Sequence, residues 1–296
     1  MSWPGTTVLV TGATGFVGSH LTRKLLAAGA RVHCLVRPTS ARDRLPAAAT
    51  AEAHDGSTAD AQAILARVRP QVVFHLATHF VAQHQTRDVE PLVGSNLLFT
   101  AQLLEAVACA GVAHLVNAGT AWQHRTEAPS APVTLYAATK QAAEALINYY
   151  ADAAPLGVVT LKLYDTYGPD DPRQKLFTLL ARASAGGKPL PMSPGEQLLE
   201  LVHVDDACDA FLAAGERLLG GEGSGHERFT VPAQRRYTLR EVVDLYGAVT
   251  GRKVPVVWGG RPYRAREVMV PWEGTPLPAW RARIALPDGI RTLHAS

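Results

Sequence analysis

The stretch Thr11-Gly12-Ala13-Thr14-Gly15-Phe16-Val17-Gly18 follows a short apolar run and opens a segment with helical periodicity. Glycines at this spacing, between a strand and a helix, are typical of a dinucleotide-binding loop. Gly12 permits the tight turn, Gly15 lets the backbone approach a pyrophosphate, and Gly18 allows close helix packing, while the helix N-terminus faces the anion. A plain glycine turn is the competing interpretation, and the flanking strand and helix argue against it.

Strand-like apolar runs alternate with helix-period segments through the first half of the chain. The expected central strands are residues 6–10, 31–36, 71–76, 114–117 and 158–163. The expected helices are 17–28, 60–68, 92–110 and 135–153, and the first three end at Gly or Pro stop signals. This alternation predicts an α/β, Rossmann-type doubly wound parallel sheet with helices on both faces.

Beyond Gly168 the spacing loosens and Pro and Gly become frequent, as in residues 188–195. We expect residues 1–168 to form the dinucleotide-binding domain, with residues 196–219 returning to it, and residues 169–296 to form mainly a loop-rich substrate-binding lobe. Two further helices are expected at 205–219 and 238–250. Thr238 and Glu241 have the spacing of a capping box at the start of the second.

Composition narrows the class of protein. The 296 residues are 47% hydrophobic and 19% charged, with a net charge of +3, and no apolar tract looks long enough to span a bilayer. Residues 1–5 lack the features of a signal peptide, so a cytoplasmic location is expected. The scattered basic residues argue against nucleic-acid binding. Cys34, Cys109 and Cys208 lie far apart in apolar stretches, which predicts buried thiols without a disulfide or a metal cluster.

The residue after the second strand bears on the cofactor. NAD enzymes place an acid there to bind the adenosine ribose, whereas this chain has Arg37, which favours the 2′-phosphate of NADP. Arg42 and Arg44 could assist, although a solvated helix face explains them equally well. Asp55-Gly56 follows a further short strand, the third along the chain, which is not among the central strands named above, and it is placed to meet the adenine amine. A simple turn explains that pair nearly as well.

Tyr136 and Lys140 are four residues apart and therefore share one face of a helix. A free tyrosine, with a pKa of about 10, is a poor proton-transfer group near neutrality, but a neighbouring lysine and a nicotinamide cation would favour its phenolate. Thr120 follows the strand that precedes this helix, so its hydroxyl could bind the substrate oxygen that Tyr136 protonates. Taken alone, the Tyr136 and Lys140 pair would be interpreted as a surface coincidence, and Thr120 as a turn residue.

Taken together, these residues resemble the extended short-chain dehydrogenases/reductases, which include nucleotide-sugar epimerases, dehydratases and 4-ketoreductases. Residues 11–18 look like the family's TGxxGxxG loop, and residues 75–77 like its fourth-strand motif. Thr120, Tyr136 and Lys140 look like its catalytic triad. The resemblance implies that the tyrosine handles the hydroxyl proton, the lysine holds the cofactor ribose and the threonine orients the substrate. It implies cofactor contacts at Gly12, Thr14, Gly15, Phe16, Val17, Arg37, Asp55, Gly56, Leu76, Ala77, Thr78, Asn96, Tyr136 and Lys140.

The two residues after Thr120 indicate the branch of the family. The 4,6-dehydratases carry Asp-Glu there to eliminate water, whereas this chain has Ala121 and Trp122. Residues 120–124 and 162–175 look most like CDP-abequose and CDP-paratose synthases and related NADPH-dependent 4-ketoreductases. Asp165 stands where many relatives place a substrate-binding asparagine.

Each candidate for a substrate contact has a plain alternative as a turn, core or solvated surface residue. The resemblance implies Trp122, His124 and Asp165. The cations Arg173, Lys175, Arg261 and Arg266 are candidates to clamp the diphosphate, because a guanidinium matches phosphate bidentately.

The sequence therefore predicts an NADPH-dependent reductase of the C4 keto group of a TDP- or CDP-linked 4-keto-6-deoxyhexose. An NAD-dependent epimerase is the alternative, and Arg37 argues against it. A catalytically silent cofactor sensor would be expected to have lost Tyr136 or Lys140, and both are present. The resemblance also implies a homodimer through Ala-rich helices at 92–110 and 137–153.

Overall fold

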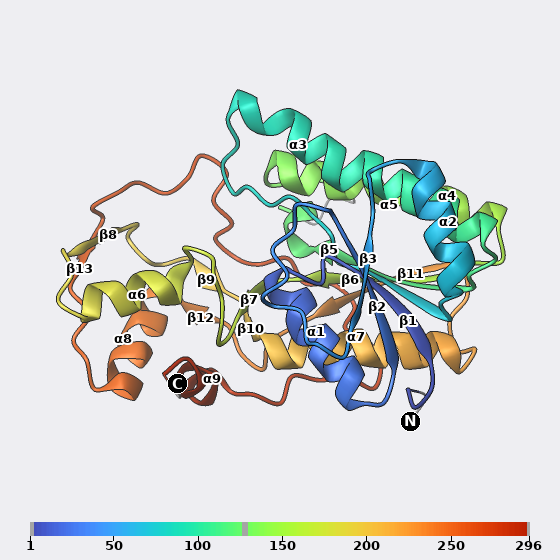
Figure 1. Ribbon diagram of the computed structural model, residues 1–296. Helices are drawn as coiled ribbons and strands as arrows, with labels where there is room; N and C mark the ends of the chain where they lie inside the picture. The colour runs from blue at the N-terminus through green and yellow to red at the C-terminus, as the bar shows by residue number, and fades with distance from the viewer. Residues whose placement is uncertain (1–2, 126–129, 295–296) are drawn as a thin grey trace.

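A parallel sheet of seven strands forms the centre of the structure, a computed structural model that describes residues 3–125 and 130–294 (Figure 1). The strand order is β11-β6-β5-β4-β1-β2-β3. Their bounds are β1 (Thr7–Thr11), β2 (Arg31–Val36), β3 (Thr50–Ala53), β4 (Val72–His75), β5 (His114–Thr120), β6 (Gly157–Leu163) and β11 (His226–Val231). The order reverses between β1 and β4, and ligands of such sheets bind at the carboxyl ends beside this reversal. The predicted fold class is confirmed.

Two strands of the sheet, β3 and β11, lie outside the strand ranges expected from the sequence. β11 comes late in the chain and pairs in parallel with β6, with Val231 opposite Leu163. Its first three residues, His226, Glu227 and Arg228, are polar, which an edge strand tolerates. The strand therefore lacks the continuous apolar run by which the central strands were recognised.

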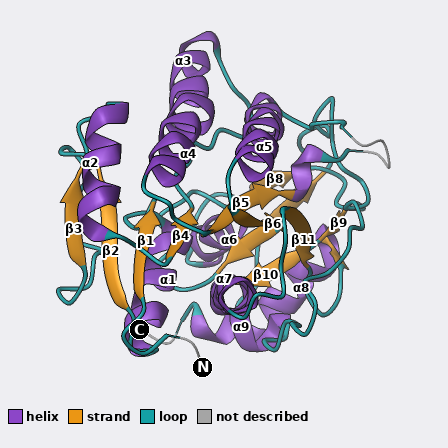
Figure 2. Cartoon of the chain, turned by 90° about the vertical axis from the view of Figure 1, so that its right-hand side faces the viewer, coloured by secondary structure: helices purple, strands orange, loops and turns teal. Residues whose placement is uncertain are grey.

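Helices cover both faces of the sheet (Figure 2). One face carries α1 (Phe16–Ala27) and α7 (Val204–Leu219), and the other carries α2 (Thr58–Val68), α4 (Phe99–Cys109) and α5 (Leu135–Ala153). Along β1, Val8 and Val10 belong to the core beneath α1 and α7, whereas Leu9 belongs to the core beneath α2 and α4. This alternation follows from the two-residue period of a strand, and both faces are apolar because both are covered.

The helix expected at 92–110 is part of a longer helical run, Thr86–Cys109. It consists of η1 (Thr86–Asp88), α3 (Val89–Val93), the π-helical turn η2 (Gly94–Leu98) and α4. By length and composition this run could cross a membrane, with a mean hydropathy of 1.4. However, Leu103, Leu104 and Val107 are buried in the domain core, and core helices of globular proteins have the same composition.

The remaining elements form a lobe beside the carboxyl edge of the sheet, at the left of Figure 1. Its helices are α6 (Leu176–Ser184), α8 (Leu239–Thr250) and α9 (Leu286–Thr292). Its short strands pair as β7 (Asp165–Tyr167) with β10 (Leu201–His203), β8 (Leu190–Met192) with β13 (Val256–Trp258), and β9 (Leu198–Leu199) with β12 (Tyr237–Thr238). The lobe has its own core around Tyr246 and Ile290. The predicted capping box of Thr238 and Glu241 is confirmed.

The cysteine prediction is wrong for one residue. Cys34 and Cys208 are buried, but Cys109 is exposed at the end of α4, and all three are free thiols. The apolar stretch around Cys109 belongs to an amphipathic helix, so its neighbours Ala106 and Val107 are buried while Cys109 lies on the outer side.

Candidate active site

The glycine loop brings three backbone segments into close contact. A Cβ atom at Gly12 would lie 2.6 Å from the backbone nitrogen of Ala77, which follows β4. A Cβ atom at Gly18 would lie 2.1 Å from the carbonyl oxygen of Gly12. Gly12 also has a positive φ of 72°. Any larger residue at these two positions would push α1 away from the ends of β1 and β4.

The start of α1 fits the pyrophosphate of a dinucleotide. The N-cap residue of α1 is Gly15, and no side chain in the described part of the chain caps the helix there. The first-turn N–H groups, beginning with Phe16, are therefore available to an anion, and the helix dipole favours negative charge at this end. A Cβ at Gly15 would meet only the Gly12 carbonyl oxygen, at 3.2 Å, which leaves the approach to the backbone open.

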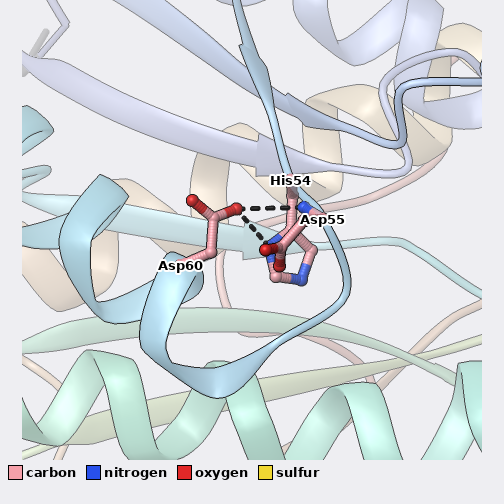
Figure 3. A group of neighbouring side chains, drawn as sticks. All are labelled: His54, Asp55 and Asp60. Carbon is pink, nitrogen blue, oxygen red and sulfur yellow. Dashed lines mark hydrogen bonds and ion pairs between the residues drawn. The ribbon is translucent and has the colours of Figure 1, made fainter.

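The expected adenine-binding residue lies on a braced turn between β3 and α2 (Figure 3). The Asp60 carboxylate accepts a hydrogen bond from the backbone N–H of Asp55 at 3.0 Å and contacts the His54 ring at 3.1 Å. Ser57 donates its backbone N–H to the Asp55 carboxylate at 2.7 Å, and this contact holds the pKa of Asp55 below its usual value. The three side chains could also offer atoms to a metal ion. Their mutual hydrogen bonds explain the cluster without one, as a brace for an ionised Asp55.

Arg37 follows directly after β2 and is exposed to solvent at the carboxyl edge of the sheet. Asp55 is exposed on the turn that follows β3, the neighbouring strand. The two residues therefore occupy the same edge, on the β2 and β3 side of the glycine loop. This placement suits contacts with the adenosine half of a dinucleotide.

Asn96 joins the loop after β4 to helix α5. It is fully buried in the π-helical turn η2. Its side-chain oxygen Oδ1 accepts from the Thr78 hydroxyl at 2.9 Å and the His79 backbone N–H at 2.8 Å, and its side-chain Nδ2 donates to the Thr139 hydroxyl at 3.0 Å. Such single π turns occur often at functional sites. Here the turn directs a buried amide toward the segment after β4, so that Thr78 is held near Tyr136.

The expected catalytic triad lies at the carboxyl edge of the sheet. Thr120 is the last residue of β5, and Tyr136 and Lys140 lie one turn apart near the start of α5. The backbone N–H of Val133 donates to the Trp122 carbonyl oxygen at 2.8 Å, which ties the start of α5 to the turn after Thr120. All three side chains are less than 10% exposed. Substrate bound here would meet them with little competing water.

Burial controls the protonation of both α5 residues. It raises the pKa of Tyr136 to about 12, although the nearby Thr78 hydroxyl and Arg173 charge oppose this. It lowers the pKa of Lys140 to about 8, against the Glu144 carboxylate. Burial thus opposes the phenolate that Lys140 and a nicotinamide cation were expected to favour, and the Lys140 charge also lowers the pKa of His75. Tyr136 is therefore a neutral acid at pH 7.

An aromatic wall stands beside Tyr136. The Phe80 ring packs edge-on against Tyr136 with centroids 4.9 Å apart, and the Trp122 ring lies 5.9 Å from Phe80. The Lys175 ammonium lies 5.1 Å from the Phe80 ring and donates to the Asp165 carboxylate at 3.0 Å. The structure thus gathers three expected substrate residues, Trp122, Asp165 and Lys175, around Phe80, which packs against the phenol.

Arg173 lies on the cofactor side of this site. Its guanidinium stacks over Phe16 of the glycine loop at 4.5 Å and binds both oxygens of Asp171. His124 is buried below Trp122, where its ring stacks on Trp272 at 3.9 Å and its Nε2 accepts from the Lys162 ammonium at 2.6 Å. His124 is therefore engaged with Lys162 and Trp272, whereas Arg173 lies near enough to Tyr136 for its charge to lower the pKa of the phenol.

The two late arginines are not brought to Tyr136 by any contact among the described residues. Arg266 donates to the carbonyl oxygens of Pro132 and Val133, at 2.6 and 3.0 Å, just before α5. Arg261 is exposed beside β8, where its backbone N–H donates to Met192. Arg266 thus supports the segment that leads into α5, and Arg261 keeps a guanidinium open to solvent.

Phe80, Gln123 and Trp272 were not singled out by the sequence interpretation. Gln123 had a usable signal, because Thr120-x-x-Gln123 matches the capping-box pattern, and the structure forms that box on η3 (Ala121–Gln123). Phe80 and Trp272 had none, since they lie in loops without periodicity and reach the site only through tertiary packing.

Comparison with known proteins places this site in a family. The sequence profile of the NAD dependent epimerase/dehydratase family matches residues 8–226, which include the glycine loop and the triad. The chain belongs to this family. A nicotinamide cofactor and a nucleotide-sugar substrate class are supported by that membership and by the relatives.

The relatives are named for different reactions on nucleotide-linked sugars. UDP-glucose 4-epimerase of Mycolicibacterium smegmatis is 30% identical over 95% of each chain. CDP-abequose synthase of Yersinia pseudotuberculosis is 26% identical over 89% of this chain and 91% of the relative. dTDP-6-deoxy-L-talose 4-dehydrogenase (NAD(P)(+)) of Kitasatospora kifunensis is 30% identical over 71% and 70%. Among solved structures, MoeE5 in complex with UDP-glucuronic acid and NAD has a TM-score of 0.83, with 26% identity over 97% of both chains.

The lowered pKa of Lys140 predicts how cofactor binding depends on pH. The ammonium, expected to hold the cofactor ribose, is charged below about pH 8 and neutral above it. Affinity for a reduced nicotinamide cofactor, NADH or NADPH, should therefore fall as the pH rises through about 8, as followed by nicotinamide fluorescence from about pH 6.5 to about pH 9.5. Lys140→Met should bind weakly without this midpoint, and the exposed Lys188→Met should retain it. Equal wild-type affinity at both extremes would contradict the assignment.

Proposed function

We propose that the protein uses NADPH to reduce the C4 keto group of a TDP- or CDP-linked 4-keto-6-deoxyhexose, in deoxysugar biosynthesis. The buried Tyr136 phenol, which packs against Phe80 at the same edge of the sheet as Thr120, carries this proposal. A carbonyl that gains hydride needs a proton on its oxygen, and a phenol whose pKa is raised to about 12 enters the reaction with that proton in place.

The residues around the phenol support this direction of reaction. The Trp122 backbone N–H donates to the Thr120 oxygen at 3.3 Å, so the threonine hydroxyl proton is available to the substrate oxygen. Tyr136 gives that oxygen a proton, and the charge of Arg173, which lowers the pKa of Tyr136, stabilises the phenolate left behind. NADPH, when bound, supplies the hydride.

Two further features favour reduction over related chemistry. Ala121 and Trp122 follow Thr120, so the turn offers no carboxyl pair for dehydration. Arg37 after β2 suits the 2′-phosphate of NADP, the cofactor that a net reductase draws on. The Phe80 and Trp122 rings provide an apolar wall suited to the methyl group of a 6-deoxy sugar.

An NAD-dependent nucleotide-sugar epimerase is the second candidate. It is supported by the M. smegmatis epimerase and by the NAD and UDP-sugar complex of MoeE5. An epimerase would purify with tightly held NAD and interconvert sugars without consuming reductant. Arg37, in place of a ribose-binding acid, weighs against it.

We further propose that the protein works in the cytoplasm as a homodimer. Apolar side chains are exposed along one side of the molecule, on α3, η2 and α5: Val89, Val93, Leu98 and Tyr149, with exposed fractions of 38, 40, 57 and 65%. A second copy would cover them. Light scattering should give twice the 31.6 kDa chain mass.

The direct test is turnover. Stopped-flow loss of NADPH absorbance should follow mixing with a TDP- or CDP-4-keto-6-deoxyhexose, and Tyr136→Phe should slow it by about 100-fold or more while retaining NADPH binding. No oxidation of NADPH with any such sugar would rule out the proposed reaction. Sugar interconversion with bound NAD would establish the epimerase instead.

The cofactor preference depends on Arg37. Arg37→Ala should weaken NADPH binding by about 10-fold to 100-fold, the range of one or two charge-assisted hydrogen bonds, and leave NADH binding nearly unchanged. The exposed Arg252→Ala in the lobe should change neither. Fluorescence titration with both nucleotides checks this, and parallel losses for NADH and NADPH would mean that Arg37 does not read the 2′-phosphate.

A further inference from the structure

A buried polar cluster lies directly beneath the catalytic turn. Glu144 is 2% exposed and lies on the same face of α5 as Tyr136 and Lys140, since the three are spaced four residues apart. Its oxygen Oε2 accepts from the Arg228 guanidinium at 3.0 Å, and Oε1 lies 3.5 Å from the ammonium of Lys162, itself 3% exposed. A carboxylate paired on both oxygens has a fixed position.

Gln123 connects this carboxylate to Thr120. The Gln123 side chain is fully buried, and its Nε2 donates to Glu144 Oε1 at 2.7 Å and to Gln141 Oε1 at 3.0 Å. Its Oε1 accepts the backbone N–H of Thr120 at 3.0 Å. Two hydrogen bonds of the Gln123 amide therefore link the Glu144 carboxylate of α5 to the backbone of Thr120, the expected catalytic threonine.

The chemistry of the partners fixes the direction of the amide. An ionised carboxylate only accepts hydrogen bonds, so the NH₂ end of Gln123 must face Glu144. The oxygen end is then left for Thr120, whose N–H can only donate. A reversed amide would place oxygen against carboxylate and NH₂ against N–H, and both contacts would be lost. Only one orientation of the Gln123 side-chain amide therefore satisfies these hydrogen bonds.

We propose that Gln123 is a positioning residue that holds Thr120 in register with Tyr136 and Lys140 by fastening the end of β5 to helix α5. The capping box completes this hold, because Thr120 in return caps the turn η3 with its hydroxyl oxygen. The kinetic test described next rests on the proposed reduction, whereas the crystallographic test that follows it does not.

The kinetic test is a double-mutant cycle. Gln123→Met keeps the side-chain volume and removes the three side-chain hydrogen bonds of Gln123, and it should lower kcat by about 10-fold to 100-fold with little change in NADPH affinity. Thr120→Val removes the hydroxyl. If Gln123 acts through Thr120, the double variant should have the kcat of Thr120→Val alone. Multiplied losses, or a Gln123→Met kcat within about twofold of wild type, would overturn the proposal.

Controls separate positioning from folding. Gln71→Met also removes a glutamine that accepts a backbone N–H, from Thr7 at the opposite edge of the sheet, and should leave kcat unchanged. Gln123→Asn retains an amide in the cluster but is too short to span the distance from Glu144 to the Thr120 backbone N–H, so it should lose kcat even where Gln123→Met folds poorly. Thermal unfolding and NADPH binding are recorded for every variant.

A crystal structure of Gln123→Met with NADPH provides a test that does not depend on turnover. Thr120 should move relative to Tyr136, and an unmoved Thr120 would overturn the proposal. If the wild type oxidises no NADPH with any sugar, the proposed reduction fails, and the position of Thr120 in this structure still decides the role of Gln123.

Discussion

Three backbones meet at the glycine loop at separations that leave no room for a side chain. The Gly12 and Gly18 contacts bring the end of β1, the start of α1 and the segment after β4 together. Because of this close approach, the first turn of α1 points its N–H groups over the carboxyl edge of the sheet. The proposed cofactor site and the placement of Thr120, Tyr136 and Lys140 at the same edge of the sheet both depend on this contact.

A chain of buried hydrogen bonds extends from this contact to the catalytic helix. The Ala77 backbone N–H donates to the Thr11 hydroxyl oxygen, and that hydroxyl pairs with His75 Nδ1 at 2.8 Å. His75 Nε2 meets Thr100 at 3.0 Å, and Thr100 donates to the Asn96 carbonyl oxygen. Burial and the charge of Lys140 lower the pKa of His75 to about 3, so the ring is neutral and can both accept and donate in this chain. The loop, η2 and α5 are therefore aligned by a single polar network.

Burial of this region also sets the protonation states of Tyr136 and Lys140. In a dry environment the charged forms of Tyr136 and Lys140 are both disfavoured, so the phenol keeps its proton and the pKa of the lysine falls to about 8. Beneath them, Glu144 is charged at low cost because Lys162, Arg228 and Gln123 surround it. One helix face thus carries a neutral acid, a cation of lowered pKa and a fixed anion, in that order.

The sequence by itself determined the features that depend on local pattern. The periodicity of apolar residues predicted the central strands and helices, and the spacing of the glycines predicted the loop. The spacing of Tyr136 and Lys140 predicted that they share one face of a helix. Tertiary structure decided what depends on contacts between distant segments. The polar edge strand β11 joined the sheet only by pairing with β6, and Phe80 and Trp272 reached the site from loops. Burial is a property of the whole fold, and it raises the pKa of Tyr136 to about 12. The hydrogen bond from Gln123 to Glu144 likewise forms only when β5 and α5 pack together.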